Sequence, residues 1–260
     1  METGNEKQEK WYESMTIKMI LIAIMGLMLL IPLALIMEVI RERSANAESA
    51  RTEIGQLWAS AQTVTGPVLN VPGTRVIAND GTFVTTTMHI LPDELRVNGV
   101  LEPEMRYRGI YETVVYDSEM EISGSITIAG FEQLNDYTWQ WDKAYISLGV
   151  SDNKGISDNA ELSIGGRVIS AIPGAGQTDL FEKGISFPYA VDPSKLTESG
   201  GEFSLKLGLR GSSSVAFSPV GQTTKVALSS KWNAPSFTGN FLPAERDVTD
   251  TGFTASWVVT

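Results

Sequence analysis

The chain has 260 residues, with 31 acidic and 20 basic side chains, a net charge of −11, one histidine and no cysteine. This composition excludes disulfide bonds, thiolate metal sites and multi-histidine metal centres. The acidic excess argues against nucleic acid as a partner, because nucleic-acid binding depends on cationic contacts to phosphate. Any enzymatic chemistry would have to use carboxylates, hydroxyls and lysine.

An uncharged apolar run covers residues 19–37, between Lys18 and Glu38. As a helix it would be roughly 28 Å long, close to the thickness of a bilayer's hydrocarbon core. We therefore predict a transmembrane helix at 19–37. A cleaved signal peptide is the alternative, since residues 45–47 (Ala-Asn-Ala) have the form of a cleavage site, but the apolar run is too long and charges separate it from that tripeptide. Three basic residues on each side leave the orientation undecided by charge.

Residues 38–65 are predicted to continue the helix beyond the membrane as a stalk. Four apolar residues recur at the spacing of one helix face, namely Ile54, Leu57, Trp58 and Ala61. This face is expected to dock on the following domain or on another membrane segment. A solvated connector is the alternative, and Gly66-Pro67 is expected to end the helix.

From about Val68 the spacing of apolar residues changes from helical to alternating, and in several segments this alternation predicts half-buried antiparallel strands. Met120, Ile122, Ile126 and Ile128 take even positions, and polar residues take the odd ones. Residues 144–150, 203–209 and 226–232 show the same alternation, with turn signals between such segments. The predicted fold is mainly β: an N-terminal transmembrane helix with a helical stalk, followed by a large antiparallel β-sandwich-like extracytoplasmic domain.

No motif in the chain defines a catalytic, cofactor-binding or metal site. His89 alternates with Val84, Met88 and Ile90 and is expected on the surface of a strand, where a catalytic base would still need a nucleophile nearby. The acidic segment 152–161 is explained by Asx turns, because Lys154 and Ile156 stand where an EF-hand needs oxygen ligands; an irregular calcium site is the alternative. A glycosidase carboxylate pair has no specific support.

Three aromatic residues form a candidate ligand or partner surface, namely Trp139, Trp141 and Tyr145. On one uninterrupted strand they would face away from the side that carries Ile146 and Leu148. Rings on an exposed face could bind a sugar or a peptide. The competing interpretation is that they pack against a second sheet or lie at the lipid interface.

Several segments together, in their order and spacing, point to a known family. They are 29–33 (LLIPL), 41–43 (RER), 66–72 (GPVLNVP), 91–99 (LPDELRVNG), 108–111 (RGIY), 232–246 (WNAPSFTGNFLPAER) and 252–253 (GF). From Lys18 onward the chain resembles the CreD family of bacterial inner-membrane proteins, which are described as cell envelope integrity proteins.

The resemblance implies a cytoplasmic N-terminal tail (1–18), a periplasmic β-rich domain (66–260) in a protein of the bacterial inner (plasma) membrane, and further membrane helices beyond Thr260, so that the chain is a fragment. It implies a stress-response role, linked by regulation to sensor kinases and to tolerance of β-lactams and colicins. We expect a non-enzymatic protein without cofactors that supports envelope integrity through contacts with the lipid bilayer and with an envelope protein or peptidoglycan. A carbohydrate- or peptidoglycan-binding module, or a carboxylate-dependent glycan-active one, is the alternative.

Overall fold

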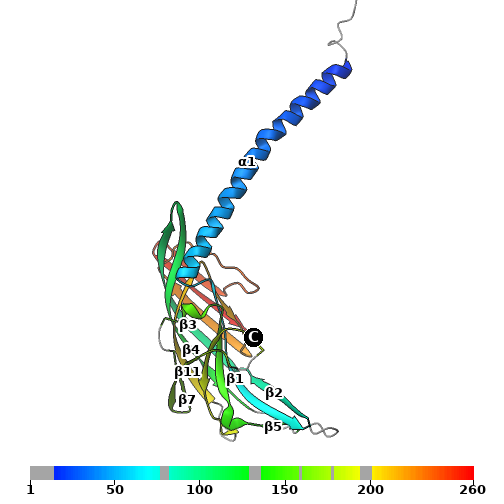
Figure 1. Ribbon diagram of the computed structural model, residues 1–260. Helices are drawn as coiled ribbons and strands as arrows, with labels where there is room; N and C mark the ends of the chain where they lie inside the picture. Colours follow the sequence, from blue (N-terminus) through cyan, green and yellow to red (C-terminus); the bar gives the residue numbers. More distant parts are fainter. Residues whose placement is uncertain (1–14, 77–81, 129–135, 158–159, 177–178, 194–200) are drawn as a thin grey trace, which may run out of the picture. The chain divides into compact units, whose positions relative to one another are not determined.

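The computed structural model describes residues 15–76, 82–128, 136–157, 160–176, 179–193 and 201–260. The chain divides into two compact units, Met1–Ala50 and Arg51–Thr260. Helix α1 (Met15–Leu57) accounts for the described part of the first unit, and its last turns belong to the second. Figure 1 shows α1 and the strands that follow it.

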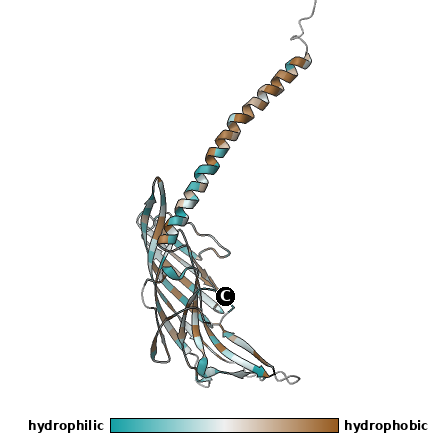
Figure 2. Cartoon of the chain, in the orientation of Figure 1, coloured by the Kyte–Doolittle hydropathy of each residue, from teal (hydrophilic) through white to brown (hydrophobic). Residues whose placement is uncertain are grey.

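Helix α1 contains a segment long and apolar enough to cross a membrane, with 0% of that segment buried. Figure 2 shows hydrophobic residues concentrated in the part of α1 that begins at Met15 and hydrophilic residues beyond it. Pro32 lies inside the helix, which membrane helices tolerate. The predicted membrane helix at 19–37 therefore falls entirely within α1.

The helical stalk is shorter than the segment 38–65 predicted for it. It ends at Leu57, and strand β1 (Gln62–Val76) begins well before residue 66. Residues 63–65 (Thr-Val-Thr) are all β-branched and favour a strand, where such side chains pack well. Gly66-Pro67 therefore lies inside β1, at a shift in its register with β6 (Tyr145–Val150), and does not end the helix.

The strands of the described residues form two sheets, the first with seven strands. This sheet, called sheet A here, has the order β12 (Val215–Ser218), β1, β6, β10 (Gly184–Pro188) and β9 (Ile172–Pro173). Two further strands, β2 (Phe83–Ile90) and β5 (Thr138–Trp139), also pair with β1. β12 and β1 are parallel, whereas the other pairs in sheet A are antiparallel.

The second sheet, sheet B, has eight strands. Their order is β14 (Glu245–Thr249), β15 (Gly252–Val259), β13 (Thr223–Ser230), β3 (Glu94–Arg108), β4 (Tyr111–Ile126), β11 (Gly201–Ser212), β7 (Glu161–Ile164) and β8 (Arg167–Ser170). β13 and β3 are parallel and the remaining pairs antiparallel. Figure 1 shows β3, β4, β11 and β7 side by side.

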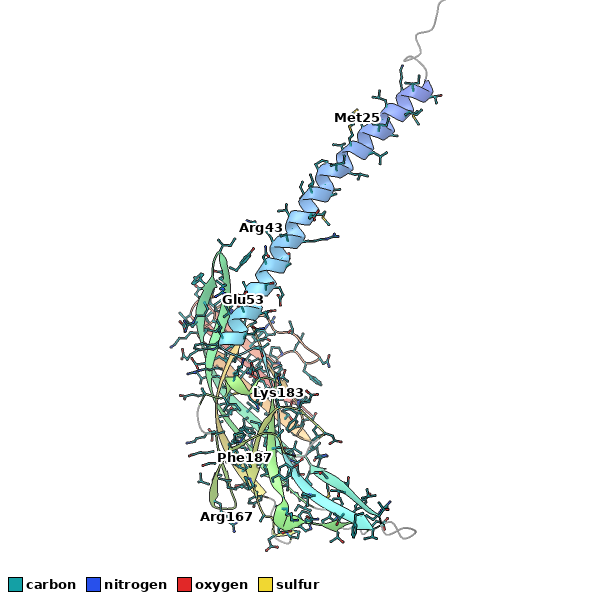
Figure 3. The ribbon with its side chains drawn as sticks, in the orientation of Figure 1. Met25, Arg43, Glu53, Arg167, Lys183 and Phe187 are labelled. Carbon is teal, nitrogen blue, oxygen red and sulfur yellow. The ribbon has the colours of Figure 1, made fainter. Side chains whose placement is uncertain are left out.

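One core lies between the two sheets and contains apolar side chains from both. Phe187 of sheet A, labelled in Figure 3, and Leu205 and Ile122 of sheet B are each 0% exposed. The predicted alternation in β4 is confirmed, since Met120, Ile122 and Ile126 are buried and their neighbours Glu119 and Glu121 are exposed. The mainly β, sandwich-like architecture predicted from the sequence is therefore present.

Strand β6 differs from the predicted half-buried pattern because both of its faces are buried. Ile146 and Leu148 enter the core as expected, but Ser147 and Gly149 are also covered. A Cβ added to Gly149 would lie 2.6 Å from the ring of Phe181, in the segment before β10. The chain before β10 therefore covers the outer face of sheet A at this strand.

Strand β14 forms one edge of sheet B. All five of its residues are exposed, and three of them are charged: Glu245, Arg246 and Asp247. Among the described residues it pairs with β15 alone.

Candidate functional site

The predicted aromatic surface is divided between two environments. The single turn η3 (Trp141–Lys143) separates Trp139 from Tyr145, so the three rings do not share one strand. Trp139 and Trp141 are half-buried and pack against the core. Trp139 lies against Gly73, whose Cβ would come within 2.5 Å of the indole.

Tyr145 lies on the other face of sheet A. It pairs with Asn70 of β1, next to Ile146, which enters the core. The ring contacts Gly176, where a Cβ would lie 2.4 Å from it. The structure therefore does not assemble Trp139, Trp141 and Tyr145 into one platform, and a ligand surface at these residues stays a prediction.

His89 belongs to a polar network on the outer face of sheet A. Its Nδ1 lies 2.7 Å from Oδ1 of Asn70, and its Nε2 lies 2.9 Å from Oδ1 of Asp179. The amide nitrogen of Asn70 donates to the Ser147 hydroxyl at 2.6 Å and to the Val68 carbonyl at 3.0 Å. This assignment leaves Asn70 Oδ1 as an acceptor, so Nδ1 of His89 is the donor.

The same network keeps the His89 imidazole from contacting the buried hydroxyl of Ser147. The Asn70 amide stands between the imidazole and the hydroxyl of Ser147, and Asn70 and Ser147 are both 0% exposed. A base must reach the proton that it removes, directly or through one water. The His89 side chain is 20% exposed, so it is more enclosed than the surface position predicted from the sequence. Its contacts join β2, β1 and the segment that covers sheet A.

The acidic segment 152–161 forms an Asx turn where it is described. Asp152 accepts a hydrogen bond from the backbone of Lys154 at 3.1 Å, just before the single turn η4 (Asn153–Gly155). Residues 158 and 159 lie outside the described part of the chain. Within that part, no group of three or more His, Cys, Asp and Glu side chains is placed to hold a metal ion.

A set of contacts that we call the clamp joins the end of α1 to sheet B. The guanidinium groups of Arg106 and Arg210 lie 5.0 and 5.1 Å from the ring centre of Trp58. Arg108, two residues along β3 from Arg106, forms an ion pair with Glu53 of α1 at 2.7 Å. Ile54 is buried on the same helical turns, whereas Leu57 is 82% exposed. Part of the predicted stalk face therefore docks on the β-domain, and Leu57 does not.

Hydrogen bonds from the chain after Trp58 complete the clamp. The Gln62 side chain, 1% exposed, donates to the carbonyls of Asp152 and Arg210 and accepts from the Asp152 backbone. The Asp152 carboxylate accepts from the backbone and the hydroxyl of Ser60, both at 3.2 Å. Burial works to raise the pKa of Asp152, but these hydrogen bonds and the one from Lys154 outweigh it and lower the pKa.

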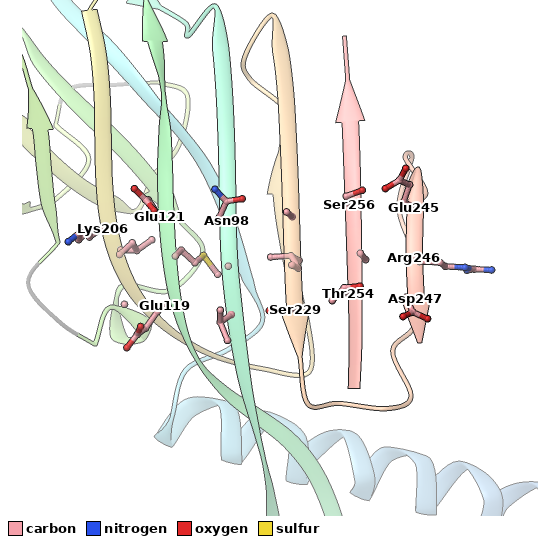
Figure 4. Close-up of a pocket in the computed structure, with 18 residues that line it drawn as sticks. Asn98, Glu119, Glu121, Lys206, Ser229, Glu245, Arg246, Asp247, Thr254 and Ser256 are labelled. Atoms are coloured by element: carbon pink, nitrogen blue, oxygen red, sulfur yellow. The ribbon is translucent and has the colours of Figure 1, made fainter. Parts of the chain in front are cut away.

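A shallow hollow of about 930 Å³ lies on sheet B. Residues of β11, β4, β3, β13, β15 and β14 line it, and Figure 4 shows ten of them labelled. Four carboxylates lie along it: Glu119, Glu121, Glu245 and Asp247. Lys206 also lines it, while the side chain of Arg246 extends away from the other labelled groups in Figure 4.

The hollow is an open and polar surface. Its four carboxylates are solvent-exposed, and its lining contains no aromatic residue. Near it, Glu94 accepts hydrogen bonds from Lys225 and Arg96, which lower the pKa of its carboxyl. Small-molecule sites are usually concave and mostly apolar with a few converging polar groups. The hollow instead has exposed acidic groups on two of its strands, β4 and β14. Sequence reasoning missed it because it is formed by strands far apart in the chain.

Together, a long exposed apolar helix and a β-sandwich with an open acidic face define a membrane-anchored protein with a large β-domain. The comparisons with known proteins give the family. Residues 14–260 match the family described as inner membrane protein CreD, and the chain belongs to this family. It is therefore an inner-membrane protein, as the resemblance predicted.

The Escherichia coli (strain K12) inner membrane protein CreD is 29% identical to the chain over 237 residues, which cover 89% of the chain and 52% of the E. coli protein. The chain thus spans about half the length of this curated relative. Among solved structures, an M1 zinc metallopeptidase from Deinococcus radiodurans covers 64% of the chain and 38% of its own, with 8% identity and a TM-score of 0.34. At that score the likeness supports no conclusion about this protein.

Proposed function

We propose that the protein acts in the periplasm as a non-enzymatic, membrane-anchored binding protein that supports envelope integrity under stress. The observation that carries the proposal is the open hollow of sheet B. Exposed carboxylates on β4 and on β14, with three strands between them, suit contact with an extended envelope component of complementary charge. The absence of aromatic residues from the lining and the exposure of its carboxylates favour binding over glycan hydrolysis, which needs two carboxylates flanking a sugar bond.

Residues of the hollow can be tested by charge reversal. Glu119 and Glu121 are exposed on β4, so Glu119→Lys with Glu121→Lys should leave the fold intact and weaken capture of envelope proteins from solubilised inner membranes. Glu202→Lys, at an exposed position of β11 outside the hollow, is the control. Cells with the double variant should lose tolerance of envelope-directed agents, and cells with the control should keep it. Equal capture and equal tolerance in both would contradict the proposal.

The orientation is tested separately. We expect protease added to spheroplasts to cut the chain after residue 57 and to leave residues 1–18 protected by the inner membrane. Cleavage of the tail in intact spheroplasts, with the β-domain protected, would place the domain in the cytoplasm and refute the periplasmic assignment.

A second candidate function is glycan binding near Trp139. Tyr137 stacks on Trp139 with ring centres 5.4 Å apart, and the guanidinium of Arg75 lies 5.2 Å from the Tyr137 ring centre. Stacked rings beside a cation are a surface on which a sugar can pack. Tyr137→Ala removes the stacked ring but keeps the Trp139 indole that packs on Gly73. Loss of muropeptide binding in this variant, with the fold retained, would support a glycan site.

A further inference from the structure

The β3–β4 hairpin extends beyond the core of the sandwich and ends in an exposed tip. The two strands pair from Glu94 opposite Ser125 to Arg108 opposite Tyr111. On β3 the last core residue is Leu101, and the strand continues for seven residues beyond it. The connection is the two-residue loop 109–110, with Gly109 at φ 61°, the conformation for which the first position of a type II′ turn selects glycine.

The clamp sets the direction in which this hairpin points. Arg106 contacts Trp58, and Arg108, closer to the turn, contacts Glu53. Moving along β3 toward the turn therefore corresponds to moving along α1 toward its N-terminus. Within the β-domain, the turn is therefore directed to the side at which α1 enters this unit at Arg51. Thirteen residues, Glu38 to Ala50, connect the apolar run 19–37 to the β-domain, and as a helix they are about 20 Å long.

The chemistry of the tip suits a lipid headgroup layer. Ile110 is 80% exposed and Tyr107 is 68% exposed, a combination of apolar and amphipathic side chains at the end of a narrow hairpin. Arg106 and Arg108 flank them on β3. Tyrosine is enriched at membrane interfaces, and arginine can bury its methylene stem there while its charged head stays hydrated.

We propose that the tip of the β3–β4 hairpin, Tyr107 to Tyr111, enters the headgroup layer of the membrane that holds α1. The β-domain then has a second point of attachment to the bilayer beside its helix. This inference goes beyond the proposed function and does not depend on it, because it requires only that the chain is anchored in a membrane.

The absence of cysteine from the chain allows a direct test, since each introduced thiol is unique. The 260-residue chain with Ile110→Cys is labelled with a nitroxide and reconstituted in vesicles of phosphatidylcholine and phosphatidylglycerol. Val168→Cys is the matched control, because Val168 is apolar and 69% exposed next to Arg167, which Figure 3 shows far from Glu53 within the β-domain. Collisions of the label with oxygen and with a water-soluble nickel complex report its depth.

We expect the label at Ile110 to collide more with oxygen and less with nickel than the label at Val168. Equal ratios at the two positions would overturn the proposal. Shielding that disappears as the protein-to-lipid ratio is lowered would show a second copy covering the tip, and would also overturn it.

A companion pair of variants separates insertion from simple burial. With the label at Tyr107→Cys, Ile110→Asp should increase nickel collisions because a carboxylate is expelled from the interface, while Ile110→Leu should leave them unchanged. Both substitutions lie at an exposed position, and an unchanged circular dichroism spectrum confirms that the fold is retained. No difference between the two would refute the lipid contact.

Discussion

Replacing Leu205 with alanine tests the packing of the sandwich at its centre. Leu205 of β11 is 0% exposed and lies opposite Ile122 of β4 and Leu162 of β7. Removing a fully buried leucine side chain and leaving a cavity costs about 2–5 kcal/mol. For a domain of this size that loss corresponds to a decrease in midpoint temperature of roughly 4–20 °C.

The next residue along the same strand is the control. Lys206 is exposed, and its neighbours across the strands are Glu121 and Glu161, so Lys206→Ala should change the stability by no more than about 0.5 kcal/mol. Thermal unfolding of the full chain in detergent, followed by tryptophan fluorescence at one fixed scan rate, measures both. If Leu205→Ala unfolds at the temperature of the unaltered chain, or Lys206→Ala costs as much as Leu205→Ala, the assignment of faces in β11 is incorrect.

Three further substitutions probe the two faces of sheet A and the clamp. Asn70→Ala removes hydrogen bonds from a buried network and should cost about 1–3 kcal/mol in urea unfolding, whereas Asn98→Ala, at an exposed position, should cost less than about 0.5 kcal/mol. Gly73→Ala places a Cβ 2.5 Å from the ring of Trp139, so it should destabilise the fold by about 1–3 kcal/mol and change tryptophan emission. Asp152→Asn should lower stability at pH 7. Because the pKa of Asp152 is lowered from 3.8 in the folded chain, its stabilisation is present above that value and is lost as the pH falls through the folded pKa, so the variant and the unaltered chain should converge below about pH 4.

Each of these predictions has an outcome that would contradict it. Equal unfolding midpoints for Asn70→Ala and Asn98→Ala would mean that the buried network contributes nothing. Unchanged tryptophan emission in Gly73→Ala would show that Trp139 does not pack on β1 at this residue. A stability difference for Asp152→Asn that grows toward acid pH would reverse the sign of the pKa argument.

The parts of the fold that local patterns control could be predicted from the sequence. The apolar run at 19–37 and the alternation around Ile122 each reflect a periodicity that a single element shows by itself. The predicted stalk extends beyond the real end of the helix because Ala61 fits the helical spacing. The β-branched residues 63–65 already belong to strand β1. Periodicity gives such boundaries poorly, because the competing strand gains its stability from pairing with distant segments.

The parts of the site that depend on long-range contacts could not be predicted. The clamp brings Trp58 next to Arg106 and Arg210, and the network of His89 reaches Asp179, 90 residues away. The hollow likewise combines residues of β4 and β14, which the strand order places in one sheet with three strands between them. The predicted aromatic surface assumed one uninterrupted strand from Trp139 to Tyr145. The turn η3 interrupts it, so alternation along a strand does not determine which way these three rings face.

The charged strand β14 has a consequence for how these molecules coexist in a crowded membrane. An outermost strand has backbone donors and acceptors through which another polypeptide could extend the sheet. With Glu245, Arg246 and Asp247 in a strand of only five residues, a second molecule approaching this border would meet hydrated charges over a very short length. At this border, extension of sheet B by an identical neighbour is therefore disfavoured.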